Sequence, residues 1–316
     1  MAHNINSMMY SGEKPWHGLG KKVDKNLTSA EAIEAAGLNW KVEKFPVMAD
    51  VDGVMIPVAD KFATVRMDTH TPLGVVGDVY TVLQNASAFS FFDAVVGVKE
   101  AMYHTAGALG AGERIWLLAK LPGIIKVTKD DIIEKFLLLT NRHDGTGSVT
   151  MMFTPIRVVC QNTLNIAVGA DTNRVSLRHT TNMGLRVKEV QDQIGIVNQR
   201  FSLFEEAAQR LSKVPVKTIL DLEKYFVDSK LIKKDEDDKY STRAQNIIDE
   251  VSLLFEKGRG NDLHGVKGTY WAAFNAVTEY VDYGRTKDQG KQAESLLFGT
   301  GATLKQNAWD AALLKT

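Results

Sequence analysis

The residues best suited to chemistry lie in the segment Asn141-Arg142-His143-Asp144-Gly145-Thr146-Gly147. It combines a guanidinium, an imidazole and a carboxylate in a polar loop whose two glycines can adopt positive φ. An arginine can bind a phosphate through two parallel hydrogen bonds. A His-Asp pair is typical of metal sites that recruit further ligands. Two kinds of chemistry therefore stay open: phosphate binding by Arg142, or metal-dependent hydrolysis or nucleotide modification centred on His143, Asp144 and His179.

Further basic residues follow this loop in the sequence. Arg174 and Arg178 would share one face of a strand with Ser176, because side chains alternate along a strand. Arg157 would lie on a helix opened by Thr154 and Pro155. A row of cations and hydroxyls suits a nucleic-acid backbone, whereas the alternative interpretation is a solvated charged face. The remaining members of the basic cluster are Arg186 and Lys188.

A second candidate contact is the loop Lys14-Pro15-Trp16-His17-Gly18-Leu19-Gly20. Aromatic rings offer a stacking surface for unpaired bases, so Trp16 and His17 are candidate nucleic-acid contacts. Alternatively, Trp16 packs into the core or against a neighbouring subunit.

The charge distribution agrees with a polyanion-binding surface in the middle of the chain. The 316 residues carry no net charge, but 114–215 contain 14 basic and 9 acidic residues, a net charge of +5. Residues 1–113 have a net charge of −4 and 216–316 a net charge of −1. This is a modest basic excess, which favours a polyanion-binding surface and excludes the strongly basic class of chromatin protein.

The composition predicts a cytoplasmic protein without a cofactor or a membrane contact. Cys160 is the only cysteine, so no intrachain disulfide can form, and its apolar neighbours Val158 and Val159 favour a buried thiol. The N-terminus lacks the apolar core of a signal peptide. No apolar stretch approaches the roughly 20 residues of a membrane span.

These residues need an antiparallel sheet to position them. Alternating apolar residues and turn signals predict strands at 40–48, 54–58, 62–68, 74–83, 101–108, 113–120, 136–140, 148–153 and 174–180. Helical spacing predicts helices at 30–36, 87–98, 155–168, 182–213, 216–226, 241–256, 269–283 and 294–314. The expected fold class is α+β, with an antiparallel sheet core, a long helix and a helical C-terminal part. The expected domains are 1–215, a core with an N-terminal arm, and 216–316, all helical.

Several long segments together resemble a known family. They are KPWHGLG at 14–20, GERIWLLAKLPG at 112–123, FLLLTNRHDGTGSV at 136–149, TPIRVVCQNTL at 154–164 and GTYWAAFNAVTEYVDYGRT at 268–286. On these motifs the chain is identified as a member of the phage/plasmid-like family called domain of unknown function 932. The resemblance implies a phage, prophage or mobile-element origin and carries no established chemistry. The predicted order of strands and long helix also resembles RecT and Red-beta type single-strand annealing proteins, which form rings or filaments, although a shared fold does not by itself give function.

The leading hypothesis is a homo-oligomeric protein that binds and anneals single-stranded DNA in recombination, without nucleotide hydrolysis. Its partners would be single-stranded DNA, further copies of the chain in a ring or filament, and a phage exonuclease or host single-strand-binding protein. One alternative is the metal-dependent enzyme centred on His143. Another is a module that binds a host defence factor through the aromatic helix at 268–283. The predicted nucleic-acid contacts are Arg142, Arg157, Arg174, Arg178, Arg186, Lys188, Trp16 and His17.

Overall fold

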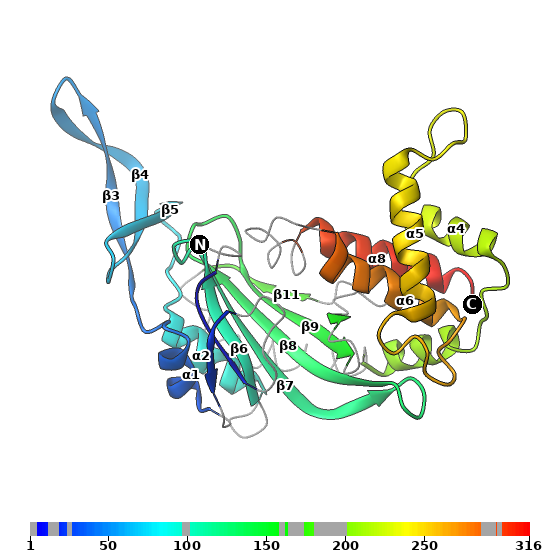
Figure 1. Ribbon diagram of the computed structural model, residues 1–316. Coiled ribbons are helices and arrows are strands. Elements are labelled where there is room, and N and C mark those ends of the chain that lie inside the picture. Colours follow the sequence, from blue (N-terminus) through cyan, green and yellow to red (C-terminus); the bar gives the residue numbers. More distant parts are fainter. Residues whose placement is uncertain are drawn as a thin grey trace. The chain divides into compact units, whose positions relative to one another are not determined.

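Figure 1 shows the computed structural model of the chain. The structure describes residues 5–11, 19–23, 27–96, 102–157, 162–163, 174–179, 201–285, 295 and 299–316. Contacts divide the chain into two compact units. Unit 1 comprises 1–122, 137–152 and 174–196, and unit 2 comprises 123–136, 153–173 and 197–316. These units divide the chain differently from the predicted domains, because β7, β8 and β9 each contain a boundary between the units.

The large sheet has eight strands in the order β10-β9-β8-β7-β6-β1-β2, with β11 also paired to β9. The pairs β1–β6, β6–β7, β9–β10 and β9–β11 are antiparallel, and β1–β2 is parallel. The predicted α+β class is confirmed. The strands are β1 (Ile5–Ser11), β2 (Lys21–Val23), β6 (Met102–Leu109), β7 (Arg114–Lys126), β8 (Ile132–Arg142), β9 (Val149–Arg157), β10 (Asn162–Thr163) and β11 (Arg174–Leu177).

In unit 1 one face of this sheet packs against two helices, α1 (Ser29–Ala35) and α2 (Asn85–Val96). Thr28 begins α1 with a complete capping box, in which Thr28 and Glu31 satisfy each other's backbone N–H groups. Phe89 and Phe92 of α2 are fully buried against the sheet. The side chains that the sheet contributes to this core alternate along each strand, as expected for a sheet buried on that face.

The small sheet consists of β3 (Val42–Val51), β4 (Val54–Arg66) and β5 (Thr71–Gly77), in that order. The strands predicted at 54–58 and 62–68 form a single strand, β4. Beyond the residues that pair with β5, β3 and β4 continue as a two-stranded hairpin that projects from unit 1 (Figure 1).

Unit 2 contains the C-terminal helices. Residues 201–211 are helical, followed by α4 (Ile219–Asp228), α5 (Thr242–Lys257), α6 (Tyr270–Glu279), the π-helical turn η3 (Tyr280–Gly284) and α8 (Thr300–Leu313). Every residue of α6 is buried, including the polar Asn275, Thr278 and Glu279, and its other residues are apolar or aromatic. In the part of the chain that the structure describes, no helix combines the length and the apolar character needed to cross a membrane.

The helix predicted at 155–168 is wrong where the structure describes it. Residues 155–157 belong to β9, and 162–163 form β10. Thr154 and Pro155 have the local sequence of a helix start, but both lie inside the strand. β11 pairs with β9 up to Met152 and β10 pairs from Ile156, so Pro155 falls between these two partners, where its missing N–H costs no ladder bond to either.

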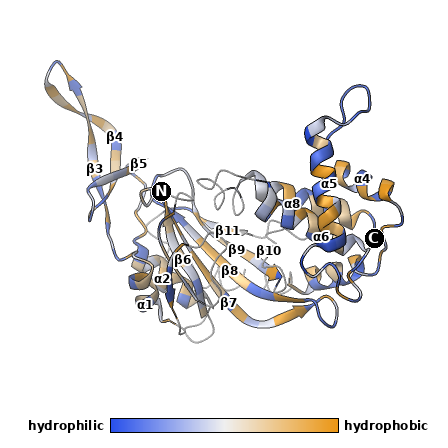
Figure 2. Ribbon diagram, in the orientation of Figure 1, coloured by the Kyte–Doolittle hydropathy of each residue, from blue (hydrophilic) through white to orange (hydrophobic). Residues whose placement is uncertain are grey.

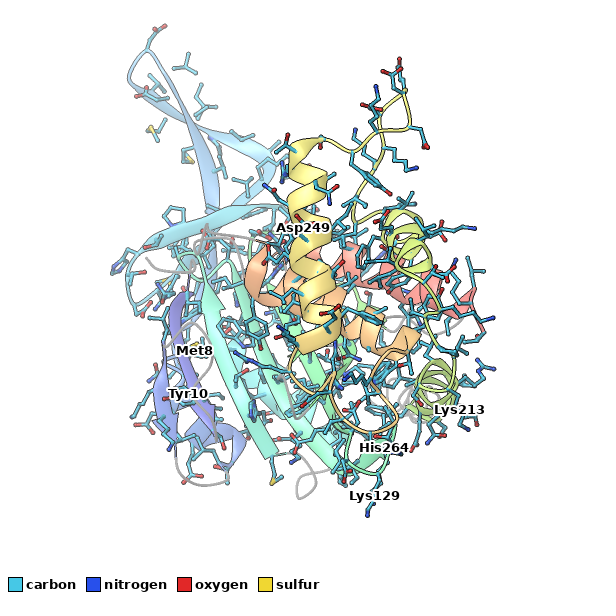
Figure 3. The ribbon with its side chains drawn as sticks, turned by 45° about the vertical axis from the view of Figure 1, so that its right-hand side comes forward. Met8, Tyr10, Lys129, Lys213, Asp249 and His264 are labelled. Carbon is cyan, nitrogen blue, oxygen red and sulfur yellow. The ribbon has the colours of Figure 1, made fainter. Side chains whose placement is uncertain are left out.

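Two other predictions, for the N-terminal arm and for the long helix, compare with the structure as follows: the first is corrected, and the second is described only in part. Residues 5–11, expected as a polar arm, form β1 and pair with β6. Met8 and Tyr10 of this strand, labelled in Figure 3, are buried. Of the long helix predicted at 182–213, the part from 201 to 211 is helical, and 182–200 lies outside the described residues.

Candidate functional site

The loop between β8 and β9 is held together by Asp144. Its carboxylate accepts hydrogen bonds from Arg142, at 2.6 Å from Nη2 and 3.1 Å from Nε, and from the backbone N–H and hydroxyl of Thr146. Burial by itself would raise the pKa of Asp144, but the hydrogen bonds from Arg142 and Thr146 outweigh it and hold the pKa below its ordinary value. Asp144 is therefore ionised and already bound within the loop.

Other elements of unit 1 pack closely against the backbone of this loop. The Thr64 hydroxyl donates to the His143 carbonyl at 2.7 Å, and the Tyr80 hydroxyl donates to the Arg142 carbonyl at 2.8 Å. A Cβ atom on Gly74 would lie 2.5 Å from the carbonyl oxygen of Asp144. Only glycine allows β5 to approach the loop so closely.

His143 is fully buried and serves as an internal hydrogen-bonding group. Its Nε2 lies 2.9 Å from Oδ1 of Asn85, and the Asn85 amide nitrogen donates to the Leu38 carbonyl. Asn85 Oδ1 is thus the acceptor, and His143 Nε2 carries the proton. Burial, followed by the nearby His179, lowers the pKa of His143 to about 3. At neutral pH its imidazole is uncharged.

His179 follows β11 and contacts Tyr80 and Thr81. Its ring stacks on Tyr80 with 4.6 Å between ring centroids, and its Nδ1 lies 3.2 Å from the Thr81 carbonyl. Burial lowers the pKa of His179 as well. Strand β11 is therefore joined to the segment that follows β5.

This arrangement bears on the alternative of a metal-dependent enzyme. His143 faces Asn85 inside unit 1, while Asp144 faces Arg142 and Thr146, so the two side chains do not converge on a common point. Among the residues that the structure describes, no three His, Cys, Asp or Glu side chains form a group able to hold a metal ion. In this loop the side chains of His143 and Asp144 make hydrogen bonds within unit 1.

Arg142 and Arg178 are brought to one face of the large sheet. Leu139 of β8 and Leu177 of β11 belong to the core beneath α1 and α2. Because side chains alternate, Arg142 and Arg178 project from the opposite face. Leu177 pairs with Val149, the first residue of β9 after the loop, so Arg142, the last residue of β8, and Arg178, which directly follows β11, lie on either side of β9. Two strand spacings place their backbones ~10 Å apart.

The two arginines differ in their surroundings. Arg178 is exposed, and no described carboxylate forms an ion pair with it. The Arg142 side chain is 24% exposed and is bound to Asp144. Arg174 lies four residues before Arg178 on the same strand, and the structure describes its backbone only.

Arg157 does not belong to this surface. Its side chain is completely buried in unit 2, where Nε and Nη2 bind the two oxygens of Asp131 at 2.7 and 2.8 Å. The guanidinium also donates to the carbonyls of Arg259 and Gly260. The interpretation of Arg157 as a surface contact for phosphate is therefore corrected: Arg157 joins β9 to the loop that precedes α6.

The other predicted contacts, Trp16, His17, Arg186 and Lys188, lie outside the described residues. Conversely, sequence reasoning missed the residues that fix the site, namely Asn85, Thr64 and Tyr80. Each comes from a different element, and no local spacing connects them with the loop at 141–147.

The buried His143 predicts a specific loss of stability in mild acid. The unfolded chain takes up a proton near the ordinary histidine pKa of 6.5, whereas the folded chain does so only near 3. The stability that His143 contributes is complete above pH 6.5 and falls as the pH drops toward 3, by ~1.4 kcal/mol per pH unit for one proton. Denaturant unfolding at pH 7, 6 and 5 measures this slope.

The free energy of unfolding depends on pH between pH 7 and pH 5, and His143→Gln should reduce this dependence by the contribution of about one proton. His264→Gln is the control, because His264 is exposed in the loop between α5 and α6 (Figure 3). Equal slopes for His143→Gln and the unaltered protein would show that this histidine is charged in the folded state.

Comparison with known proteins gives one family. The model described as "Domain of unknown function (DUF932)" matches residues 72–300. No curated protein and no solved structure matches the chain.

Proposed function

The chain belongs to the family of domain of unknown function 932, whose description states no activity, and we propose from the residues themselves that it binds single-stranded DNA without hydrolysing nucleotides. The observation that carries this proposal is the pair Arg142 and Arg178 on one sheet face, with Arg178 exposed. An exposed guanidinium with no described carboxylate partner keeps its capacity for a phosphate.

The loop contributes rigidity to this surface. Arg142 is held by Asp144, and the loop backbone is held by Thr64 and Tyr80. A phosphate that approaches Arg178 would meet a preorganised neighbour, which lowers the entropy lost on binding. The basic excess of residues 114–215 supports the same location.

Annealing is the activity that this type of binding allows. Cations hold the phosphates while the bases stay accessible for pairing, so no nucleotide needs to be hydrolysed. The proposal includes self-association, because annealing proteins hold a long strand on successive copies. Origin in a phage or other mobile element is part of the same proposal.

Binding to a fluorescently labelled oligonucleotide tests the proposal. We expect Arg178→Gln to weaken binding 3- to 10-fold and to reduce the slope of log K against log salt by ~0.7, as for one lost phosphate contact on a single strand. Fluorescence anisotropy between 20 and ~200 mM salt measures both quantities.

Arg243→Gln is the matched control, because Arg243 is an exposed arginine in α5 of unit 2. It should bind like the unaltered protein. Absence of binding at low salt would refute the proposal, and equal affinities for the two variants would refute the role of Arg178.

A further inference from the structure

The backbone of Arg178 is fixed on both sides. On one side, Leu177 pairs with Val149 of β9. On the other side, His179 makes two contacts with Thr81. The Thr81 N–H donates to the His179 carbonyl at 3.2 Å, and His179 Nδ1 lies 3.2 Å from the Thr81 carbonyl. The position of Arg178 therefore depends on where the chain at Thr81 lies.

Thr81 belongs to residues 78–84, which join β5 to α2 without regular secondary structure. Tyr80 of the same segment donates from its hydroxyl to the Arg142 carbonyl, and its ring stacks on His179. One short segment thus contacts the chain beside both arginines. Because this segment has no strand or helix ladder of its own, its backbone groups need partners elsewhere to hold it in place.

Strand β3 contains both hydrophilic and apolar residues (Figure 2), and one of the hydrophilic residues, Lys44, holds this segment. Its ammonium donates to the carbonyls of Gly77, Asp78 and Tyr80 at 3.2, 2.9 and 2.9 Å. An ammonium has three N–H donors, so these carbonyls use all of them. Lys44 Nζ also lies 4.6 Å from the centre of the Phe62 ring, a cation–π contact. Lys44 is therefore committed to the protein backbone and cannot itself bind a phosphate.

The far end of the segment is attached to the same strand. The Gln84 side chain accepts from the Val42 N–H at 3.1 Å and donates to the Val42 carbonyl at 2.7 Å. Since β3 is paired with β4 along its length, it provides a rigid base for both attachments. Of the two, the contact through Lys44 is the one that reaches Tyr80 directly.

We propose that Lys44 is a positioning residue for phosphate binding, whose ammonium fixes residues 77–81 and thereby holds Arg178 in place beside Arg142. This inference rests on the proposed function, which places DNA at these arginines. Without the ammonium, three carbonyls lose their donor and the segment gains freedom. Arg178 must then be ordered when the phosphate binds, and this cost weakens binding.

Lys44→Met and Lys41→Met test the inference as a matched pair. Both remove one positive charge from the same end of β3, so their long-range effects on an anionic strand are similar, but Lys41 is exposed and precedes the strand. We expect Lys44→Met to weaken binding of a labelled single-stranded oligonucleotide about 3- to 10-fold, and Lys41→Met less than about twofold. Equal losses for the two variants would reduce Lys44 to its charge and overturn the inference.

The double variant with Arg178→Gln shows whether Lys44 acts through this arginine. Changes that act through one residue are not additive, so Lys44→Met should weaken binding less than about twofold further once Arg178 is replaced. A full 3- to 10-fold further loss, roughly the effect of Lys44→Met alone, would mean that Lys44 acts independently of Arg178 and would overturn the inference.

Hydrogen exchange of the protein without DNA tests the same contact separately from binding. The amides of Tyr80 and Thr81 donate to the carbonyls of Gly77 and His179, and Lys44→Met should speed their exchange whereas Lys41→Met should not. Exchange in α6 should stay unchanged, which shows that the variant folds. Unchanged exchange at Tyr80 and Thr81 in Lys44→Met would overturn the inference even if the protein binds DNA.

Failure of the proposed function has a different signature. If the unaltered protein binds no oligonucleotide, DNA binding is refuted and the role of Lys44 in phosphate binding with it. Faster exchange in Lys44→Met would then still show that Lys44 fixes residues 77–81.

Discussion

Replacement of Arg157 by methionine is expected to lower the free energy of unfolding by about 3–5 kcal/mol, because it leaves the Asp131 carboxylate buried without its cation. Both side chains are completely buried. Arg157 also donates to the carbonyls of residues 259 and 260, which lose these donors in the variant. Denaturant unfolding followed by far-UV circular dichroism measures the loss.

Arg259→Met is the control for this experiment. Its side chain is 61% exposed and lies 3.9 Å from Glu279, so its removal should cost under ~1 kcal/mol. The double replacement Arg157→Met and Asp131→Leu should recover part of the loss, since no unpaired charge then remains buried. A loss below ~1 kcal/mol for Arg157→Met would mean that the pair is solvated, which returns Arg157 to the candidates for phosphate binding.

Two buried tryptophans in unit 2 provide the second prediction. Trp271 and Trp309 are both fully buried, but the Trp271 Nε1 donates to Asp131 at 2.7 Å, whereas the Trp309 Nε1 has no acceptor among the described residues. Each Trp→Phe replacement loses similar packing. Trp271→Phe additionally takes a donor from a buried carboxylate, so it should cost ~1.5–3 kcal/mol more than Trp309→Phe.

Far-UV circular dichroism is the appropriate measurement, because both variants change the tryptophan fluorescence. Trp309→Phe serves as the matched control for lost volume. Equal losses for the two variants would show that the bond to Asp131 contributes no net stability. Neither variant should alter affinity for single-stranded DNA at low denaturant, since both positions are internal.

The two sets of variants separate folding from binding. Arg157 and Trp271 meet at Asp131 inside unit 2, whereas Arg142 and Arg178 lie on unit 1. If the proposed function holds, Arg178→Gln changes binding without changing stability, and Arg157→Met changes stability first.

The sequence by itself was sufficient to predict part of the local structure. The alternation at 136–140 and 148–153 predicted β8 and β9, and helical spacing at 30–36 predicted α1. Repeated spacing also predicted the C-terminal helices, and the motifs identified the family. These features depend on neighbours along the chain, so the sequence displays them directly.

Other features were decided by tertiary contacts. Thr154 and Pro155 favour a helix start locally, yet pairing with β10 and β11 makes the segment a strand, because strand pairing and burial outweigh one local preference. Arg157 resembles any basic residue in sequence, and only the position of Asp131, 26 residues away along the chain, shows that it is internal. Whether an arginine meets a carboxylate or solvent depends on residues distant in sequence, so charge patterns gave the number of cations and the fold determined which of them face outward.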